Sequence, residues 1–274
     1  MNKLPVLLAV YSVREEAAAD FRAAMTKVKE LGYEGVELAG LYGLDAAAIR
    51  AVLDELELPA VSAHIPLADM VADIDAVVAD AKVLGLKYAA IPYLPAEQRP
   101  GTDAFQAVLD AIPEISARFR EAGIQLLYHN HDFEFIPMPD GRTGLDTIYD
   151  TFTPEQLAAE PDTCWVRVAG YDPAEWIDRY AGRVPVVHLK DFVMTGRPAN
   201  LYQLIGTTVD EEEEGEGSFD FRPLGEGQQD IPAILAAALR VGSEYVVVEQ
   251  DRSSDRSPFE AAAASRRYLA SLGW

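Results

Sequence analysis

Short apolar runs alternate with longer amphipathic segments along the whole chain. The apolar runs have the length of buried β-strands, which is about four to six residues. They predict strands at residues 5–10, 35–38, 59–64, 88–91, 126–129, 157–160, 184–189 and 245–248.

The segments between these runs carry apolar residues at helical spacing. Phe21, Met25, Val28 and Leu31 recur in this way, and Gly32 then ends the segment. Similar patterns predict helices at residues 15–31, 46–56, 73–84, 103–122, 144–152, 173–180, 231–241 and 258–272.

Strands that alternate with helices imply a parallel sheet with right-handed crossovers. Eight such units in 274 residues, with no linker rich in Pro, Gly or Ser between two halves, match the length of one (β/α)8 TIM barrel. We therefore predict a single barrel domain over residues 1–274. A doubly wound open sheet is the alternative, but the turn after the first strand, at 11–16, lacks the glycines of such folds.

A long polar segment at residues 191–229 follows the seventh strand. Loops of more than about 15 residues are uncommon and often act as lids. We expect a mobile acidic tip at 211–216 and an ordered return at 219–227 beside the pocket. Phe219 and Phe221 could cover a bound ligand there, and Glu226 could bind its polar groups. A plain surface insertion is the alternative.

Composition limits the classes of partner. The formal net charge of -22 would repel nucleic acid and anionic membrane surfaces, so we expect neither as a partner. The single cysteine, Cys164, excludes an intramolecular disulfide and fits a reducing compartment. The first apolar run is too short for a signal peptide or a membrane span. We therefore expect a cytoplasmic protein, which could form a homo-oligomer.

All four histidines lie at predicted strand ends. His64 ends the third strand, His129 and His131 end the fifth, and His188 ends the seventh. The active site of a (β/α)8 barrel lies at the C-terminal ends of its strands, so these side chains should meet. His129 and His131 are two residues apart and should share a face. An incidental surface turn is the alternative for this pair.

Other polar residues fall at the same positions. They are Glu37 after strand two, Tyr93 after strand four, Asp162 after strand six, Lys190 after strand seven and Glu249 after strand eight. Some have a purely structural alternative, because Asp162 could cap a helix and Lys190 could pair with a neighbouring aspartate.

Asp162, His188, Glu249 and one strand-five histidine would supply mixed oxygen and nitrogen ligands. Such a set suits one divalent metal ion, and among Mn, Co, Zn and Mg the nitrogen ligands favour Mn or Zn. We therefore predict one divalent metal ion as cofactor.

Seven segments match motifs that recur in one family, in order over nearly the whole chain. They are Tyr11-Ser12-Val13-Arg14-Glu15, Gly32-Tyr33-Glu34-Gly35-Val36-Glu37, Ser62-Ala63-His64, Tyr128-His129-Asn130-His131-Asp132-Phe133-Glu134-Phe135, His188-Leu189-Lys190-Asp191, Leu224-Gly225-Glu226-Gly227 and Val248-Glu249-Gln250-Asp251. Together they resemble the sugar phosphate isomerase/epimerase family. This family is part of the xylose isomerase-like TIM barrel superfamily, which also contains inosose dehydratases and ketose 3-epimerases.

The resemblance implies a ligand set. Relatives commonly hold a metal with a Glu on strand five, an Asp after strand six, a His on strand seven and a Glu on strand eight. By resemblance these fall on His129, Asp162, His188 and Glu249. His131 would be either a fifth ligand or a neighbour that contacts the ligands without binding the metal. The chain departs from the pattern at His129, where relatives carry Glu, which puts a symmetric epimerisation with two glutamates in doubt.

By the same resemblance we expect a metal-dependent isomerase or epimerase that acts on a keto-sugar or cyclitol through an enediolate. Glu249 would move the proton, and His131, His129 or Lys190 would be the second proton-transfer group. One alternative is a lyase, either an inosose dehydratase or a 3-keto-glycoside-cleaving enzyme, and another is a non-catalytic sugar-binding barrel. The substrate would be bound by Glu37, His64, Tyr93, Trp165 and Glu226.

The superfamily also includes endonuclease IV, an abasic-site nuclease. That enzyme has a metal-binding histidine where this chain has Trp165, which argues against a nuclease.

Overall fold

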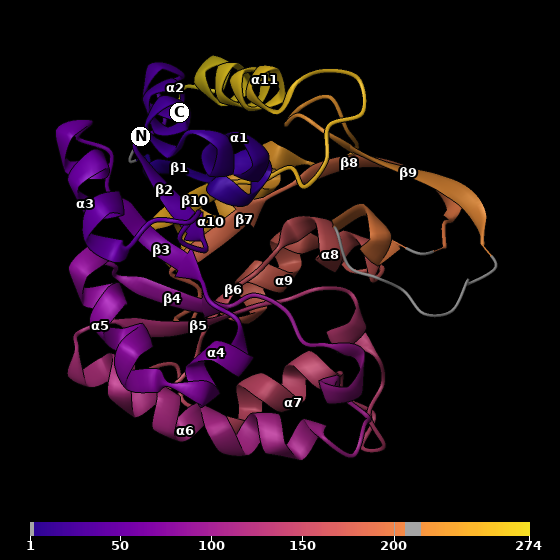
Figure 1. Cartoon of the computed structure of the whole chain (residues 1–274). Helices are drawn as coiled ribbons and strands as arrows, with labels where there is room; N and C mark the ends of the chain where they lie inside the picture. The colour runs from indigo at the N-terminus through magenta and orange to yellow at the C-terminus, as the bar shows by residue number, and fades with distance from the viewer. Residues whose placement is uncertain (1–2, 200, 206–214) are drawn as a thin grey trace.

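The computed structural model describes residues 3–199, 201–205 and 215–274. Eight parallel strands form a nearly closed barrel with helices between them (Figure 1), which confirms the predicted (β/α)8 fold. Their order is β6-β5-β4-β3-β2-β1-β10-β7. Among the described helices, none is long and apolar enough to cross a membrane.

The predicted strands and most of the predicted helices lie close to their expected positions. The barrel strands are β1 (Val6–Ala9), β2 (Gly35–Ala39), β3 (Ala60–His64), β4 (Tyr88–Ile91), β5 (Gln125–His129), β6 (Ala158–Glu160), β7 (Val186–Leu189) and β10 (Tyr245–Val248). The α-helices are α1 (Arg14–Ala19), α2 (Phe21–Glu30), α3 (Ala46–Glu55), α4 (Leu67–Ala72), α5 (Ile74–Leu84), α6 (Phe105–Glu121), α7 (Gly144–Thr151), α8 (Thr163–Val168), α9 (Pro173–Arg179), α10 (Ile231–Val241) and α11 (Pro258–Ser271). Short 3-10 helices are η1 (Val10–Val13), η2 (Ala96–Gln98), η3 (Phe133–Phe135) and η4 (Leu201–Ile205).

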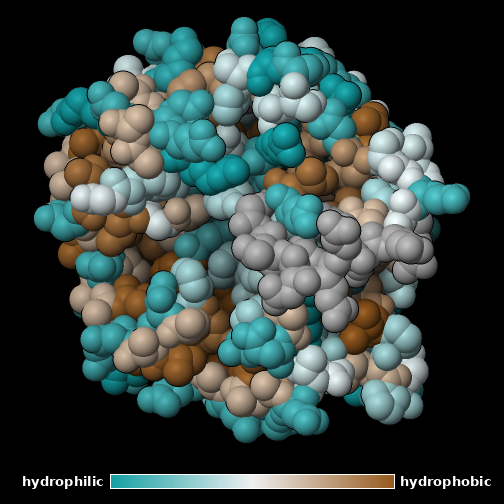
Figure 2. All heavy atoms as spheres, turned by 45° about the vertical axis from the view of Figure 1, so that its right-hand side comes forward, coloured by the Kyte–Doolittle hydropathy of each residue, from teal (hydrophilic) through white to brown (hydrophobic). Residues whose placement is uncertain are grey.

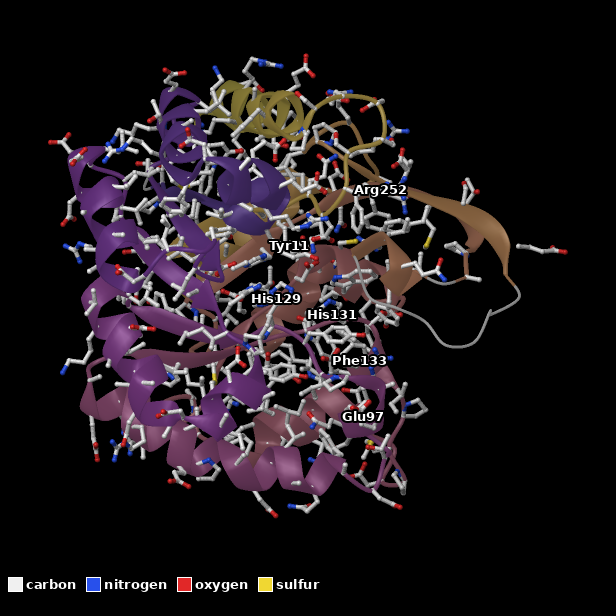
Figure 3. All side chains as sticks on the ribbon, in the orientation of Figure 1. Tyr11, Glu97, His129, His131, Phe133 and Arg252 are labelled. Carbon is white, nitrogen blue, oxygen red and sulfur yellow. The ribbon has the colours of Figure 1, made fainter. Side chains whose placement is uncertain are left out.

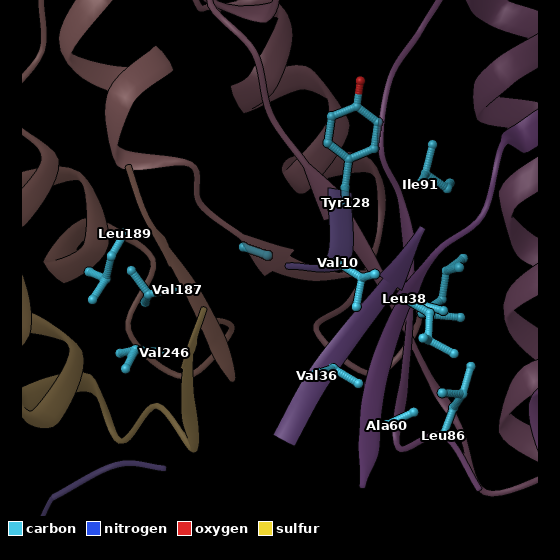
Figure 4. Packing of buried hydrophobic residues seen from close by; sticks show 14 of the residues in the cluster. Val10, Val36, Leu38, Ala60, Leu86, Ile91, Tyr128, Val187, Leu189 and Val246 are labelled. Atoms are coloured by element: carbon cyan, nitrogen blue, oxygen red, sulfur yellow. The ribbon is translucent and has the colours of Figure 1, made fainter. Parts of the chain in front are cut away.

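Alternate residues of each strand face two different cores. In β1, Leu7 and Ala9 belong to the core inside the barrel, whereas Val6 and Leu8 belong to the larger core between strands and helices. Figure 4 shows part of this larger core, with Leu38, Leu86 and Tyr128 among the residues labelled. The polar residues at the strand ends take their orientation from the same alternation.

The barrel closes at a seam between β6 and β7, which lie at the two ends of the strand order. Asp162 and His188 form an isolated parallel bridge across this seam. The backbone amide of His188 donates to the carbonyl of Pro161 at 3.0 Å, and the amide of Ala159 donates to the carbonyl of Arg183 at 2.8 Å. Two of the predicted metal ligands therefore lie at the point of closure.

The single helix predicted at 15–31 is wrong, because the structure divides it into α1 and α2 at Asp20. Asp20 has extended backbone angles, and its side chain accepts a hydrogen bond from the amide of Ala23, so it caps the second helix. The prediction also missed α4 and α8, each of which is only six residues long. Segments this short show too little periodicity to be detected.

The segment at 191–229 is not the irregular loop that we predicted. β8 (Asp191–Arg197) and β9 (Glu216–Arg222) form an antiparallel hairpin that projects from the barrel (Figure 1), and η4 follows β8. Phe192 pairs with Phe221 and Met194 with Phe219, so apolar side chains alternate along both strands. Most of the acidic tip predicted at 211–216 lies outside the described residues.

Candidate active site and metal centre

Charged and imidazole side chains meet at the C-terminal mouth of the barrel. Glu37 comes from β2, His64 from β3, His129 from β5, Glu160 from β6 and His188 from β7. The His64 ring lies 4.7 Å from that of His129 and 5.3 Å from that of His188, measured between ring centroids. Three of the four histidines therefore pack against one another, as their positions at strand ends predicted.

Two overlapping sets of four residues have the geometry to hold a metal ion. In each set the potential ligand atoms all lie within 4.8 Å of one another. One set is His129, Asp162, His188 and Glu249, which is the predicted quartet, and all four residues are buried. The other is His64, His129, Glu160 and His188. Because His129 and His188 belong to both sets, a bound ion would lie next to these two rings in either case.

Unsatisfied polar atoms at this mouth fit a cation. Glu160 Oε1 and Glu37 Oε2 are buried and have neither a hydrogen bond nor an ion pair among the described residues. Three further buried atoms are held only by a charged neighbour: Asp162 Oδ2 by Lys190 at 2.8 Å, His129 Nδ1 by Glu160 at 3.3 Å and His188 Nε2 by Glu37 at 2.9 Å. Buried polar atoms are normally hydrogen-bonded, and buried charges are normally paired or bound to metal. Carboxylate oxygens and imidazole nitrogens in this state are suitable ligands for a divalent ion of the Mn or Zn type.

We call the group of His64, His129, His188, Glu37 and Glu160 the inner site. Within it, His129 and His188 differ in pKa because their neighbours differ. Burial lowers the pKa of His129 to about 4, so its ring is neutral at physiological pH. Burial would also lower the pKa of His188, but the carboxylates of Glu37 and Glu160 outweigh it and raise that pKa well above its usual value. Glu37 Oε1 is 2.9 Å from His188 Nε2 and 3.1 Å from His64 Nε2.

Lys190 is a buried cation held by several carboxylates, with 2% of its surface exposed. Its Nζ atom lies 2.8 Å from Asp162, 2.9 Å from Glu249 and 3.0 Å from Asp251. Burial would lower the pKa of Lys190, but these three carboxylates outweigh burial and raise it well above its usual value. The side chain is therefore a fixed ammonium and not a base.

Asp162 is both a helix cap and a member of a candidate metal quartet. Its Oδ1 atom accepts hydrogen bonds from the amides of Cys164 and Trp165 at 2.8 and 3.2 Å and so caps α8. Its Oδ2 atom faces Lys190 and lies 3.5 Å from His129 Nε2. The two interpretations considered for this residue in the sequence are compatible, because each uses a different oxygen.

His131 lies beside the inner site in an aromatic stack. Its ring centroid is 5.4 Å from that of Phe133 and 5.2 Å from that of Trp165. Its backbone amide donates to Glu134 Oε2 at 2.8 Å. Burial holds the pKa of the His131 ring well below its usual value, so the ring is neutral. His131 is thus held between aromatic neighbours as a neutral ring, the form that can both donate and accept a hydrogen bond.

A cavity of about 470 Å³ opens over these residues. This volume is typical of small-molecule sites, which span roughly 300–1,000 Å³. Its polar lining includes Tyr11, Tyr93, His64, His129, His131, Lys190, Glu249 and Asp251. Tyr11, His129 and His131 lie near one another in the middle of Figure 3. The surface of the molecule is hollowed in the middle of the face shown in Figure 2, with hydrophilic side chains around the hollow.

Three predicted substrate-binding residues do not line this cavity. Glu37 lies beneath it, against His64 and His188. Trp165 is fully buried behind His131. The carboxylate of Glu226 instead pairs with the guanidinium of Arg256 at 2.7 Å.

The motif around Glu226 has a structural role that the sequence did not reveal. Asp191 Oδ2 accepts hydrogen bonds from the amides of Gly225 and Gly227, both at 3.0 Å. Its Oδ1 atom accepts from the amide of Gln229 at 3.0 Å. A Cβ atom on Gly227 would lie 2.1 Å from Asp191 Oδ1, so only glycine fits there. The segment therefore wraps around a buried carboxylate at the base of the hairpin.

Sequence reasoning missed two members of the site, Glu160 and Asp251. Glu160 is fully buried, and its Oε2 atom lies 2.9 Å from His64 Nε2 and 3.3 Å from His129 Nδ1. Alternation along β6 could have revealed it, because Ala158 faces the barrel interior and Glu160 is two residues further. Asp251 has the same relation to Glu249, and burial raises its pKa to about 7 despite the nearby Lys190.

The imidazoles and carboxylates lie at the C-terminal mouth, which is where the active sites of (β/α)8 barrel enzymes are found. The chain belongs to the xylose isomerase-like TIM barrel family, whose family model matches residues 25–272.

Individual relatives are distant in sequence. The chain is 24% identical to an inosose dehydratase from Geobacillus kaustophilus, over 61% of this chain and 60% of that protein, so the match spans only part of that relative's length. A sugar phosphate isomerase/epimerase from Parabacteroides distasonis shares the fold with a TM-score of 0.78, at 21% identity over 97% of this chain and 98% of that one. A xylose isomerase-like TIM barrel protein from Mycobacterium smegmatis, solved in complex with magnesium, gives a TM-score of 0.69 at 17% identity, over 99% of this chain and 98% of that one.

Proposed function

We propose that the protein is a metal-dependent isomerase or epimerase that acts on a keto-sugar or cyclitol through an enediolate. The observation that carries the proposal is the buried quartet His129, Asp162, His188 and Glu249 beneath a cavity of small-molecule size. A divalent ion held by these residues would supply Lewis-acid polarisation of a substrate carbonyl and its neighbouring hydroxyl. The magnesium complex of a structural relative and the isomerase/epimerase name of another support this assignment.

Glu249 is the group that we propose to take the proton from the carbon next to the carbonyl. It lines the cavity, although only 4% of its surface is exposed. Burial would raise the pKa of its carboxyl, but Lys190 and His188 outweigh burial and hold that pKa well below its usual value. The side chain is therefore an ionised carboxylate, the form that a general base requires.

Lys190 would stabilise negative charge on a substrate oxygen, and His131 would transfer a proton between substrate oxygens. The Lys190 ammonium lies 2.9 Å from Glu249, so it stands next to the position where an enolate oxygen would become negative. The neutral His131 ring lines the same cavity and can carry a proton between two oxygens. His64 and Tyr93, which also line the cavity, would bind hydroxyl groups.

A lyase is the second candidate, and one feature of the chain favours it. By the family resemblance, His129 takes the place of a strand-five glutamate, so a symmetric pair of glutamates would be missing. Elimination needs the same first proton abstraction, followed by loss of a group from the next carbon, and therefore does not need that pair. The similarity to inosose dehydratases agrees with this alternative.

Deuterium exchange tests the proposal and separates the candidates. Keto-sugars and inososes are incubated with the Mn²⁺-loaded protein in D₂O and followed by NMR. An isomerase or epimerase should exchange the proton next to the carbonyl and yield an isomer, whereas a lyase should yield an unsaturated product. Glu249→Gln should stop both reactions. A non-catalytic barrel would bind a polyol without exchange, and this result would refute the proposal.

A further inference from the structure

An apolar chamber of about 200 Å³ lies beside the catalytic cavity. It is enclosed by the ends of β2 and β3, the β2–α3 loop, and helices α4 and α5. Its apolar walls include Leu38, Ile65, Val77, Ala81, Leu84 and Leu86. Asp69 and Asp80 also contribute to the lining, and both side chains are exposed to solvent. The interior of the chamber is therefore hydrophobic, with carboxylates that remain hydrated.

The chamber adjoins the catalytic cavity. Gly40, His64, Pro66 and Asp69 line both spaces. His64 also contacts Glu160 at 2.9 Å, so the shared boundary is next to the inner site. A molecule bound over Glu249 and Lys190 would reach the chamber by passing His64.

The size and lining of the chamber suit an apolar ring and not a sugar. A dry apolar cavity of roughly 150 Å³ lined by Leu, Ile and Phe is known to bind benzene. The chamber is slightly larger, at about 200 Å³. A polyol placed there would leave hydroxyl groups unpaired against leucine side chains, which is costly. The polar cavity and the apolar chamber therefore suit two different parts of one ligand.

We propose that the chamber binds an apolar substituent on the substrate, a phenyl-sized or short branched alkyl group attached to the sugar or cyclitol. The inference rests on the proposed function, because it places the polyol part of the same molecule over Glu249. It narrows the substrate class from free polyols to polyols that carry an apolar group.

Binding of two simple glycosides tests this inference without any need for turnover. Phenyl β-D-glucoside and methyl β-D-glucoside are titrated into the Mn²⁺-loaded protein by calorimetry. Phenyl β-D-glucoside should bind at least about tenfold more tightly, because its ring leaves water for an apolar site. Val77→Phe and Ala81→Leu should fill the chamber and remove this preference while leaving binding of the methyl glucoside unchanged. Ala238→Leu, the same enlargement in a buried position on α10, is the control and should preserve the preference.

The inference is overturned if phenyl β-D-glucoside binds no more tightly than the methyl compound, or if its preference survives both chamber-filling variants. The two proposals fail separately. Deuterium exchange without a phenyl preference removes the chamber assignment alone, whereas a phenyl preference without exchange in any polyol removes the proposed reaction alone.

Discussion

Asp162 uses its two carboxylate oxygens for different purposes. Oδ1 caps α8 through the amides of Cys164 and Trp165, while Oδ2 faces Lys190 and His129. An asparagine at this position can keep the capping oxygen but carries no negative charge. This residue therefore offers a way to separate helix capping from metal binding.

We expect Asp162→Asn to lose at least about tenfold in metal affinity, because the charged ligand is lost while the cap of α8 is kept. Elemental analysis after dialysis would measure the bound ion, and near-UV circular dichroism would report on the fold. Asp172→Asn is the matched control, since Asp172 caps α9 through the amides of Ala174 and Glu175 outside the metal quartets. Stoichiometric metal in a double variant, Asp162→Asn with Glu249→Ala, would contradict the ligand assignment.

Glu134 is a fully buried carboxyl group with a supporting role behind His131. It accepts hydrogen bonds from the Tyr128 hydroxyl at 2.7 Å and from the His131 amide at 2.8 Å. Burial raises the pKa of Glu134 to about 8, from an ordinary value of 4.5. Between these two pH values the folded state holds a proton that the unfolded state has released.

The free energy of unfolding should therefore fall as pH rises from about 4.5 to about 8, because the folded state binds more protons in this window. The contribution of Glu134 is complete below pH 4.5 and lost above pH 8. Urea unfolding of the wild type and of Glu134→Gln across this range isolates the effect, since other titrating groups cancel in the difference. A difference between the two proteins that stays constant with pH would show that Glu134 does not titrate in this way.

Residue-level reasoning from the sequence predicted which side chains would lie together, because the ends of barrel strands converge at one mouth. The quartet His129, Asp162, His188 and Glu249 is brought together as expected. Glu160 was missed because it sits one residue before Pro161 and reads as part of a strand. The salt bridge of Glu226 with Arg256 could not be foreseen, because it joins side chains 30 residues apart.

At the scale of elements, the β8–β9 hairpin was mistaken for a loop. Its strands contain Gly196, Gly217 and several polar residues, which lower the β propensity. Phe192 and Met194, like Phe219 and Phe221, are two residues apart, and this alternation of apolar residues is the sequence pattern that indicates two β-strands. The base of this hairpin is ordered by Asp191, whose carboxylate accepts hydrogen bonds from the segment at 225–229.

Gly227→Ala should lower the free energy of unfolding by about 1–3 kcal/mol, the usual cost of forcing extra volume into a packed site. The added methyl would meet Asp191 Oδ1 at 2.1 Å. Urea denaturation would measure the loss.

Glu226→Ala is the neighbouring control and should change stability by less than about 1 kcal/mol, since its ion pair with Arg256 is partly exposed. If Gly227→Ala proved as stable as Glu226→Ala, the close packing of residues 225–229 around Asp191 would not contribute to stability as proposed. The same control tests the sequence-based hypothesis for Glu226, because a KM raised about tenfold in Glu226→Ala would support a contact with substrate.

For the whole molecule, the barrel was predictable because its strands and helices repeat with clear periodicity. The eight predicted strands correspond to β1 to β7 and β10. The form of the closure between β6 and β7 could not be read from the sequence, because strand patterns do not show that these two strands are joined by an isolated bridge and not by a full ladder. We propose that residues 1–274 form one domain, for which near-UV and far-UV circular dichroism should give coincident thermal transitions. Two separate transitions would point to two domains.

The seam of the barrel also has a consequence for how the molecule opens. Asp162 and His188, which bridge β6 and β7, come from opposite sides of the joint and belong to the same candidate metal quartet. A metal ion bound to both residues would link β6 to β7. Metal binding would therefore stabilise the closed barrel, and closure of the barrel would in turn favour metal binding. Amide hydrogen exchange at His188, whose N–H donates across the seam to Pro161, should therefore slow on addition of Mn²⁺ and quicken with a chelator, while exchange in the β1–β2 ladder stays unchanged. In such a barrel the metal ion that takes part in the reaction would also stabilise the contact between the two strands that close the barrel.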